Sequence, residues 1–119
     1  MAEVIDLDIL KPEGKIVKLN EHEIDLSFVP CGITFEVDEI VRELSSINKD
    51  KLDKNGNETK LAFDLCIKLC TVFCEHDFPE MTEEWFRRKV DGSQINIMAN
   101  LIKDALNRSY QGIERYGKN

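Results

Sequence analysis

Residues 58–75 read ETKLAFDLCIKLCTVFCE, a run with more apolar side chains than an ordinary surface helix carries. At about 100° per residue, the apolar side chains cover roughly 240° of a helical wheel. A surface helix needs an apolar stripe only somewhat wider than about 100°. We therefore expect a helix over this run that either lies centrally among the others or shows a second apolar face to another chain.

The segment before this helix predicts a β-hairpin. Residues 24–28, IDLSF, alternate apolar and polar side chains, which is typical of a strand with one buried face. Residues 16–19 are its expected partner strand, across a turn at residues 20–23. Because a lone hairpin is marginal in water, we expect this one to lie on helices or to pair with another chain.

Capping signals predict the other helices. Thr34 is expected to cap a helix that ends near Ile47, and a polar loop with an Asn-Gly turn follows it. Thr82 is expected to cap a short helix over residues 83–89. Asp91 and Gln94 have the spacing of a capping box, which predicts the start of a last helix running to about residue 115.

These elements predict a mainly helical α+β fold, an N-terminal β-hairpin followed by a three- to four-helix bundle. The length of 119 residues fits one domain, which we place at residues 14–119. Residues 1–13 hold too few apolar side chains to build anything alone, and Pro12 with Gly14 punctuates their end. We interpret them as a flexible N-terminal arm.

The composition is that of a globular protein, with 42% hydrophobic and 33% charged residues. Sixteen Lys and Arg against 23 Asp and Glu give a net charge of −7, so we expect no nucleic acid partner. The apolar runs are too short for a membrane span. The N-terminus lacks the pattern of a signal peptide, so a cytoplasmic location with reduced thiols is expected.

Three cysteines in the helix expected over residues 58–75, which we call the wide-faced helix, suggest a metal site. Cys66, Cys70 and Cys74 follow i, i+4, i+8 spacing, with His76 close behind. The outer two lie about 12 Å apart along the axis, too far for all three thiolates to reach one zinc ion at about 2.3 Å. Two of them with His76 and Cys31 remain geometrically conceivable. We expect core packing, because buried cysteine behaves as a small hydrophobe.

No catalytic or cofactor motif stands out. His22 lies in the expected hairpin turn and His76 after a helix, and neither has the context of a cysteine-hydrolase signature. The serines lack nucleophile-elbow surroundings, and Gly56 and Gly92 are isolated, so no phosphate-binding loop is predicted. We therefore expect no enzyme, no catalytic residues, no cofactor and no bound metal.

Apolar side chains outside the expected core faces are candidates for partner binding. One edge of the wide-faced helix and one edge of the last helix remain after the core faces are assigned. We interpret Trp85 as the side chain that enters the core and anchors its short helix; the alternative is that it faces a partner. Packing inside the domain is the alternative for both edges. The candidates are Phe63, Ile67, Cys74, Trp85, Ile97 and Leu101.

The stretch from Leu61 to Tyr110 resembles small tail assembly chaperones of long-tailed bacteriophages and related prophages. The shared pattern is a long apolar helix, a proline, a Thr-Glu-Glu-Trp helix start at residues 82–85, and a Val-Asp-x-x-Gln step at residues 90–94. The opening hairpin fits as well, so the resemblance covers residues 14–116. These motifs carry no chemical signature, and no site residue is transferred through them.

The resemblance implies a non-catalytic helper that binds the tape measure protein, a long helical, aggregation-prone chain, until tail tube subunits assemble around it. It also implies self-association, a place in the host bacterial cytoplasm and absence from the mature virion. In many such phages a frameshift yields a second, extended form. The alternatives are a structural tail or connector component and a small homo-oligomeric adaptor.

Overall fold

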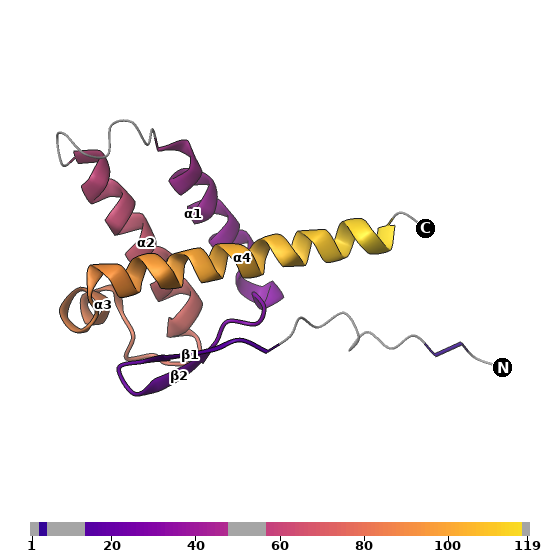
Figure 1. Ribbon diagram of the computed structural model, residues 1–119, viewed down its shortest axis with the longest axis horizontal. Helices are drawn as coiled ribbons and strands as arrows, with labels where there is room; N and C mark the ends of the chain where they lie inside the picture. The colour runs from indigo at the N-terminus through magenta and orange to yellow at the C-terminus, as the bar shows by residue number, and fades with distance from the viewer. Residues whose placement is uncertain (1–2, 5–13, 48–56, 118–119) are drawn as a thin grey trace.

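The computed structural model describes residues 3–4, 14–47 and 57–117, with the side chains of residues 57–58 and 111–117 left aside. The described part of the chain is an N-terminal two-stranded antiparallel hairpin followed by four α-helices, the predicted mainly helical α+β arrangement (Figure 1). The expected N-terminal arm, residues 1–13, falls almost wholly outside the described residues. No described helix combines the length and apolar character needed to cross a membrane.

The hairpin pairs β1, Ile16–Leu19, with β2, His22–Asp25. Leu19 lies opposite His22, so the turn has two residues, Asn20 and Glu21, rather than the four expected. Both have positive φ, 48° and 69°. Two positive-φ residues are what a tight hairpin turn requires.

The alternation predicted for residues 24–28 holds only as far as Leu26. Leu26 donates its N–H to the Lys15 carbonyl and is fully buried. Beyond it, Ser27 is buried and Phe28 is exposed, which reverses the expected order. The cause is local: the Ser27 hydroxyl accepts from Lys15 N–H at 2.7 Å, and Ser27 N–H donates to an Asp25 carboxylate oxygen at 2.9 Å. These two hydrogen bonds of Ser27 interrupt the alternation and end the strand.

Helix α1, Thr34–Ser46, follows a short 3-10 turn, Cys31–Ile33. Ile33, rather than the predicted Thr34, occupies the position before the helix. The Thr34 hydroxyl instead donates to the Pro30 carbonyl at 3.0 Å, inside the turn. The expected cap was therefore wrong by one residue, although the helix itself was predicted.

The wide-faced helix is α2, Asn57–Glu75, and it lies centrally, the first of the two expected arrangements. It packs against α1, α3 and α4, which together cover most of its circumference. Figure 1 shows α1 and α2 side by side, with α4 crossing both and the hairpin at the far end of the bundle. Its fully buried side chains include Leu69 and Cys70.

Helices α3, Glu83–Lys89, and α4, Gly92–Gly117, begin at the predicted capping residues. The Thr82 hydroxyl accepts from Trp85 N–H at 3.2 Å. The Asp91 carboxylate accepts a hydrogen bond from Ser93 N–H at 3.1 Å. The side-chain oxygen of Gln94 accepts one from Asp91 N–H at 2.9 Å. The hydrogen bonds from Ser93 also hold the pKa of the Asp91 carboxyl below its usual range. These reciprocal contacts satisfy donors that the first turn of a helix leaves free.

Candidate functional site

The predicted partner-binding edge of α2 is largely covered. Ile67 is 7% exposed and Cys74 is 1% exposed, so both belong to the hydrophobic core and the prediction that they face a partner is corrected. The neighbouring helices bury this edge, as the alternative interpretation required. Phe63 stays 37% exposed; it lies in the N-terminal half of α2, where its ring reaches the start of α4. A Cβ placed on Gly92 would lie 3.2 Å from Phe63 Cε1.

The predicted edge of α4 is divided. Ile97 is 61% exposed, whereas Leu101 is half-buried and packs against the core. On a wheel of about 100° per residue, Ile97 lies roughly 140° from the face that holds Met98 and Ile102. Ile97 therefore points away from the bundle.

Helix α3 is pinned by Phe86 rather than by Trp85. Phe86 is fully buried, while Trp85 is half-buried at the margin of the core. The two rings meet edge-on, 5.0 Å apart at an angle of 86°. The sequence correctly indicated that only one of two adjacent aromatic residues enters the core, but the choice between them was wrong.

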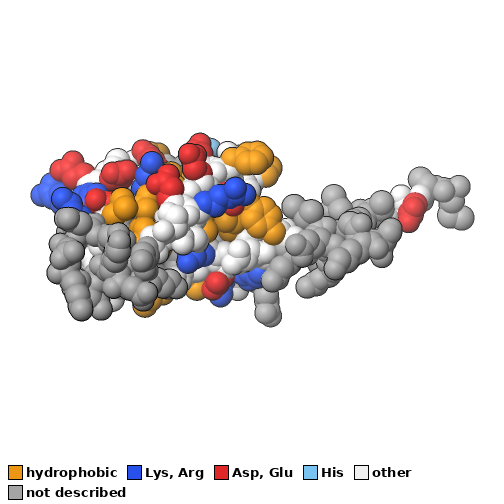
Figure 2. Space-filling view, turned by 90° about the horizontal axis from the view of Figure 1, so that it is seen from above, with side chains coloured by type: hydrophobic (Ala, Val, Ile, Leu, Met, Phe, Trp, Pro, Cys, Tyr) orange, Lys and Arg blue, Asp and Glu red, His pale blue; other side chains and the backbone are white. Residues whose placement is uncertain are grey.

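The six predicted residues therefore do not form one surface. Two are core residues and Leu101 packs half-buried against the core, whereas Trp85 lies beside the hairpin, Phe63 lies beside Gly92, and Ile97 points outward from α4. Hydrophobic side chains also reach the surface elsewhere, between charged ones, as Figure 2 shows for one face of the molecule. A candidate docking site needs apolar residues that are contiguous.

Such a site lies between α1, α2 and α4, and we call it the three-helix groove. Its apolar wall comes from the end of α1 and the first turns of α2, with one residue of α4; these residues are Leu44, Ile47, Ala62, Cys66 and Ala99. The groove has a volume of about 210 Å³ and is open to solvent. Small-molecule sites usually occupy about 300–1,000 Å³. The groove therefore suits one or two side chains of a docked segment better than a cofactor.

The opposite rim of the groove is polar and comes from α4. Asn96, Asn100 and Lys103 line it. Their spacing of four and three residues places them on one face of the helix, beside the core face that includes Ile95, Met98 and Ile102. This polar spacing on α4 is the signal in the sequence that indicates the groove, and it is not an apolar edge.

A hydrogen bond also joins the first turns of α1 to α4, outside the residues that line the groove. The Tyr110 hydroxyl donates to an Asp38 carboxylate oxygen at 2.9 Å, and Arg42 pairs with the other oxygen at 2.9 Å. The hydrogen bond to Asp38 raises the pKa of the Tyr110 phenol. These contacts hold the first turns of α1 against α4.

The thiols have the environment of core residues. Burial raises the pKa of Cys66, which the positive charge of Lys103 partly offsets. Burial places the pKa of Cys70 well above its usual value and raises that of Cys74 to about 12. A thiol kept protonated is a poor nucleophile and a poor metal ligand. Within the described part of the chain, no three His, Cys, Asp or Glu side chains converge closely enough to hold a metal ion.

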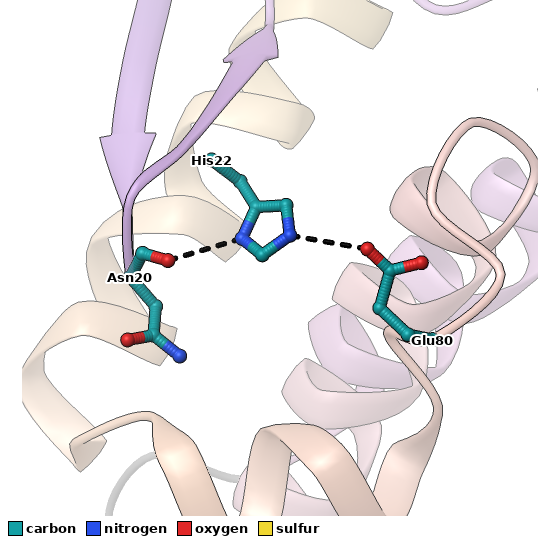
Figure 3. A network of polar contacts seen from close by, with 3 residues as sticks. All are labelled: Asn20, His22 and Glu80. Carbon is teal, nitrogen blue, oxygen red and sulfur yellow. Dashed lines mark hydrogen bonds and ion pairs between the residues drawn. The ribbon is translucent and has the colours of Figure 1, made fainter.

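A separate cluster of polar and aromatic side chains, which we call the hairpin corner, contains His22, Phe78, Glu80 and Trp85. His22 Nδ1 donates to the Asn20 carbonyl at 3.0 Å, and Nε2 lies 3.1 Å from a Glu80 carboxylate oxygen (Figure 3). The imidazole also meets the rings of Phe78 and Trp85 edge-on, at 5.2 Å and 5.8 Å. Since both polar partners are acceptors, a protonated imidazole satisfies both. His22 thereby ties the hairpin to the segment between α2 and α3.

Comparisons of the chain with protein-family models, with curated protein sequences and with solved structures give no match.

Proposed function

We propose that this protein is a non-enzymatic phage tail assembly chaperone that binds the tape measure protein and keeps it soluble during tail morphogenesis. The observation that carries the proposal is the three-helix groove, an apolar recess that is open to solvent and framed by three helices. Grooves of this kind bind amphipathic helices through side chains spaced at i, i+3, i+4 and i+7. A long helical client offers such side chains repeatedly.

The charge of the chain supports the same function. A net charge of −7 keeps a coated client soluble, because like-charged complexes repel one another. The groove itself is small, so each copy contributes a weak contact, and many copies along one client supply the total affinity. Binding the client in its unfolded or monomeric form lowers the concentration of free client that can aggregate. We place this activity in the host bacterial cytoplasm, with self-association along the client.

Co-expression tests the proposal directly. A tape measure fragment from the same phage or prophage is produced alone and together with this protein, and the soluble fraction of the fragment is measured after centrifugation. We expect the fragment to be mainly insoluble alone and mainly soluble with the protein, and to copurify with it. The proposal fails if the purified protein neither binds the fragment nor changes its solubility.

The second candidate function is a structural component of the tail or connector, or a small homo-oligomeric adaptor. The exposure of Ile97 on the outer face of α4 favours this candidate, because a permanent subunit contact would cover it. Mass spectrometry of purified mature particles separates the two functions. A chaperone is absent from the particles, whereas a structural component is present in fixed copy number.

A further inference from the structure

The three-helix groove has an unusual charge for this molecule. The chain carries 23 acidic and 16 basic residues, yet none of the described residues that line the groove is a carboxylate. Lys103 is the one charged residue among them, and it lies close enough to Cys66 to influence the pKa of that thiol. The described lining of the groove therefore carries one positive charge and no negative charge, in a chain whose net charge is −7.

The hydrogen-bonding groups on the rim lead to the same conclusion. Asn96, Asn100 and Lys103 span eight residues of α4, a rise of about 10 Å at 1.5 Å for each of the seven steps. The amides donate and accept, and the ammonium only donates. Lys103 is half-buried, and no ion pair of Lys103 is found among the described residues. A carboxylate that docks beside it gains a charge-assisted hydrogen bond in a partly desolvated setting.

We propose that the groove binds an amphipathic helix that carries a carboxylate at the edge of its apolar face. The apolar side chains of this helix pack on the wall formed by Leu44, Ile47 and Ala62, and its Asp or Glu pairs with Lys103. The inference rests on the proposed function, and it specifies which helical segments of a client are chosen. Helices with a basic residue at that edge are rejected, because they bring a second cation to Lys103.

Two designed peptides test this preference. Both are 20-residue amphipathic helices with Leu at i, i+3, i+4 and i+7, and they differ only in Glu or Lys at the edge of the Leu face. Fluorescence anisotropy of the labelled peptides gives the dissociation constants with the full-length protein. We expect the Glu peptide to bind about tenfold or more tightly than the Lys peptide. Equal affinities, or tighter binding of the Lys peptide, overturn the proposal.

Variants assign the preference to the groove. Lys103→Glu should reverse the order of the two peptides, whereas Lys60→Glu makes the same charge change on the opposite face of α2 and should leave the order unchanged. Asn100→Trp fills the groove and should lower the affinity for both peptides about tenfold. Asn107→Trp, outside the groove, is its control and should leave both affinities unchanged. Circular dichroism and thermal unfolding establish that each variant is folded. If Lys103→Glu and Lys60→Glu behave alike, the groove is not the binding site.

The same variants separate this inference from the proposed function. If Asn100→Trp, which fills the groove, still keeps a tape measure fragment soluble, the groove inference is wrong and the chaperone function stands. If the wild-type protein prefers the Glu peptide but leaves the fragment insoluble, the groove chemistry stands and the chaperone function is wrong. Light scattering with and without peptide shows whether a second copy of this chain competes for the groove. If the wild-type protein forms dimers that the peptide does not disrupt and Asn100→Trp abolishes them, the groove is a contact between copies of this chain and the inference is overturned.

Discussion

The centre of the bundle and the hairpin corner are held by different kinds of contact. Where α2 meets its neighbours, the interior consists of uncharged side chains such as Leu69, Cys70 and Ile102, all fully buried. At the hairpin corner, a histidine joins a backbone carbonyl, a carboxylate and two aromatic edges, and it stays partly in contact with solvent. The centre thus depends on the exclusion of water, whereas the corner depends on the geometry of a few polar groups.

This difference has a consequence for stability. Apolar burial contributes about 25 cal/mol per Å² and tolerates no charge. Partly exposed hydrogen bonds contribute about 0.5–1.5 kcal/mol each. Damage at the centre should therefore affect the whole fold, whereas damage at the corner should loosen the hairpin from the helices.

Leu69→Ala is the strongest test of the centre. The side chain is fully buried in α2, and a cavity left by Leu→Ala costs about 2–5 kcal/mol of unfolding free energy. Urea denaturation followed by circular dichroism measures the loss. Leu61→Ala, at an exposed position of the same helix, is the control and should cost less than about 1 kcal/mol. Equal losses for the two variants would contradict the central position of α2.

Alkaline pH sharpens the contrast, because it ionises the central thiols in the unfolded chain before it ionises them in the folded core. The pKa of Cys74 is about 12 in the folded protein and about 9 in the unfolded chain. The unfolded state therefore loses this proton first, and stability falls as the pH rises from about 9 towards 12, by about 1.4 kcal/mol per pH unit for one thiol. Urea midpoints at pH 8 to 10.5 should fall less steeply for Cys74→Ala than for wild type. Cys31→Ala, at an exposed thiol, should follow wild type.

His22→Ala breaks the hairpin corner. We expect a loss of about 1–2 kcal/mol, because the substitution removes the contact to Glu80 together with the aromatic edges of Phe78 and Trp85. A double-mutant cycle with Glu80→Ala isolates the pair of side chains. If the two losses add without coupling, the contact between His22 and Glu80 contributes nothing to the corner.

Glu21→Gly should stabilise the hairpin turn, next to the hairpin corner, slightly. Glu21 has a φ of 69°, a conformation that glycine adopts at no steric cost, so the variant should gain up to about 1 kcal/mol. Thermal unfolding should show a small rise in midpoint. Glu23→Gly, within β2, should lower the midpoint instead, because glycine weakens an extended strand. A fall for Glu21→Gly would mean that the Glu21 side chain stabilises the turn.

The sequence predicted the elements well wherever the signals were local. The hydrogen bonds at Thr82 and at Asp91 with Gln94 involve residues only three apart, so the pattern alone determines them. The apolar width of residues 58–75 likewise predicted a helix, but it left open whether that helix lies centrally or shows a second apolar face to another chain. The fold class followed from these signals and from the hairpin pattern.

What the sequence missed depends on contacts between distant residues. The wheel of the short helix does not distinguish Trp85 from Phe86, and Trp85 lies at the margin of the core, where its ring meets His22 of the hairpin. The burial of Ser27 follows from its bond to Lys15, twelve residues away. The three-helix groove needs the crossing of α1, α2 and α4, and a helical wheel of one segment contains no information on a crossing. For that reason Ile67 and Cys74 were assigned to a surface that neighbouring helices cover.

Gly92 adds a constraint that a set of related sequences would reveal. A Cβ added at position 92 would lie 3.2 Å from the ring of Phe63, tighter than an ordinary van der Waals contact. Positions 63 and 92 should therefore covary during evolution. Chains with a large aromatic residue at 63 should keep glycine at 92, and chains with alanine or serine at 92 should carry a slimmer residue at 63. The junction between α2 and α4 would then vary as a pair and not site by site.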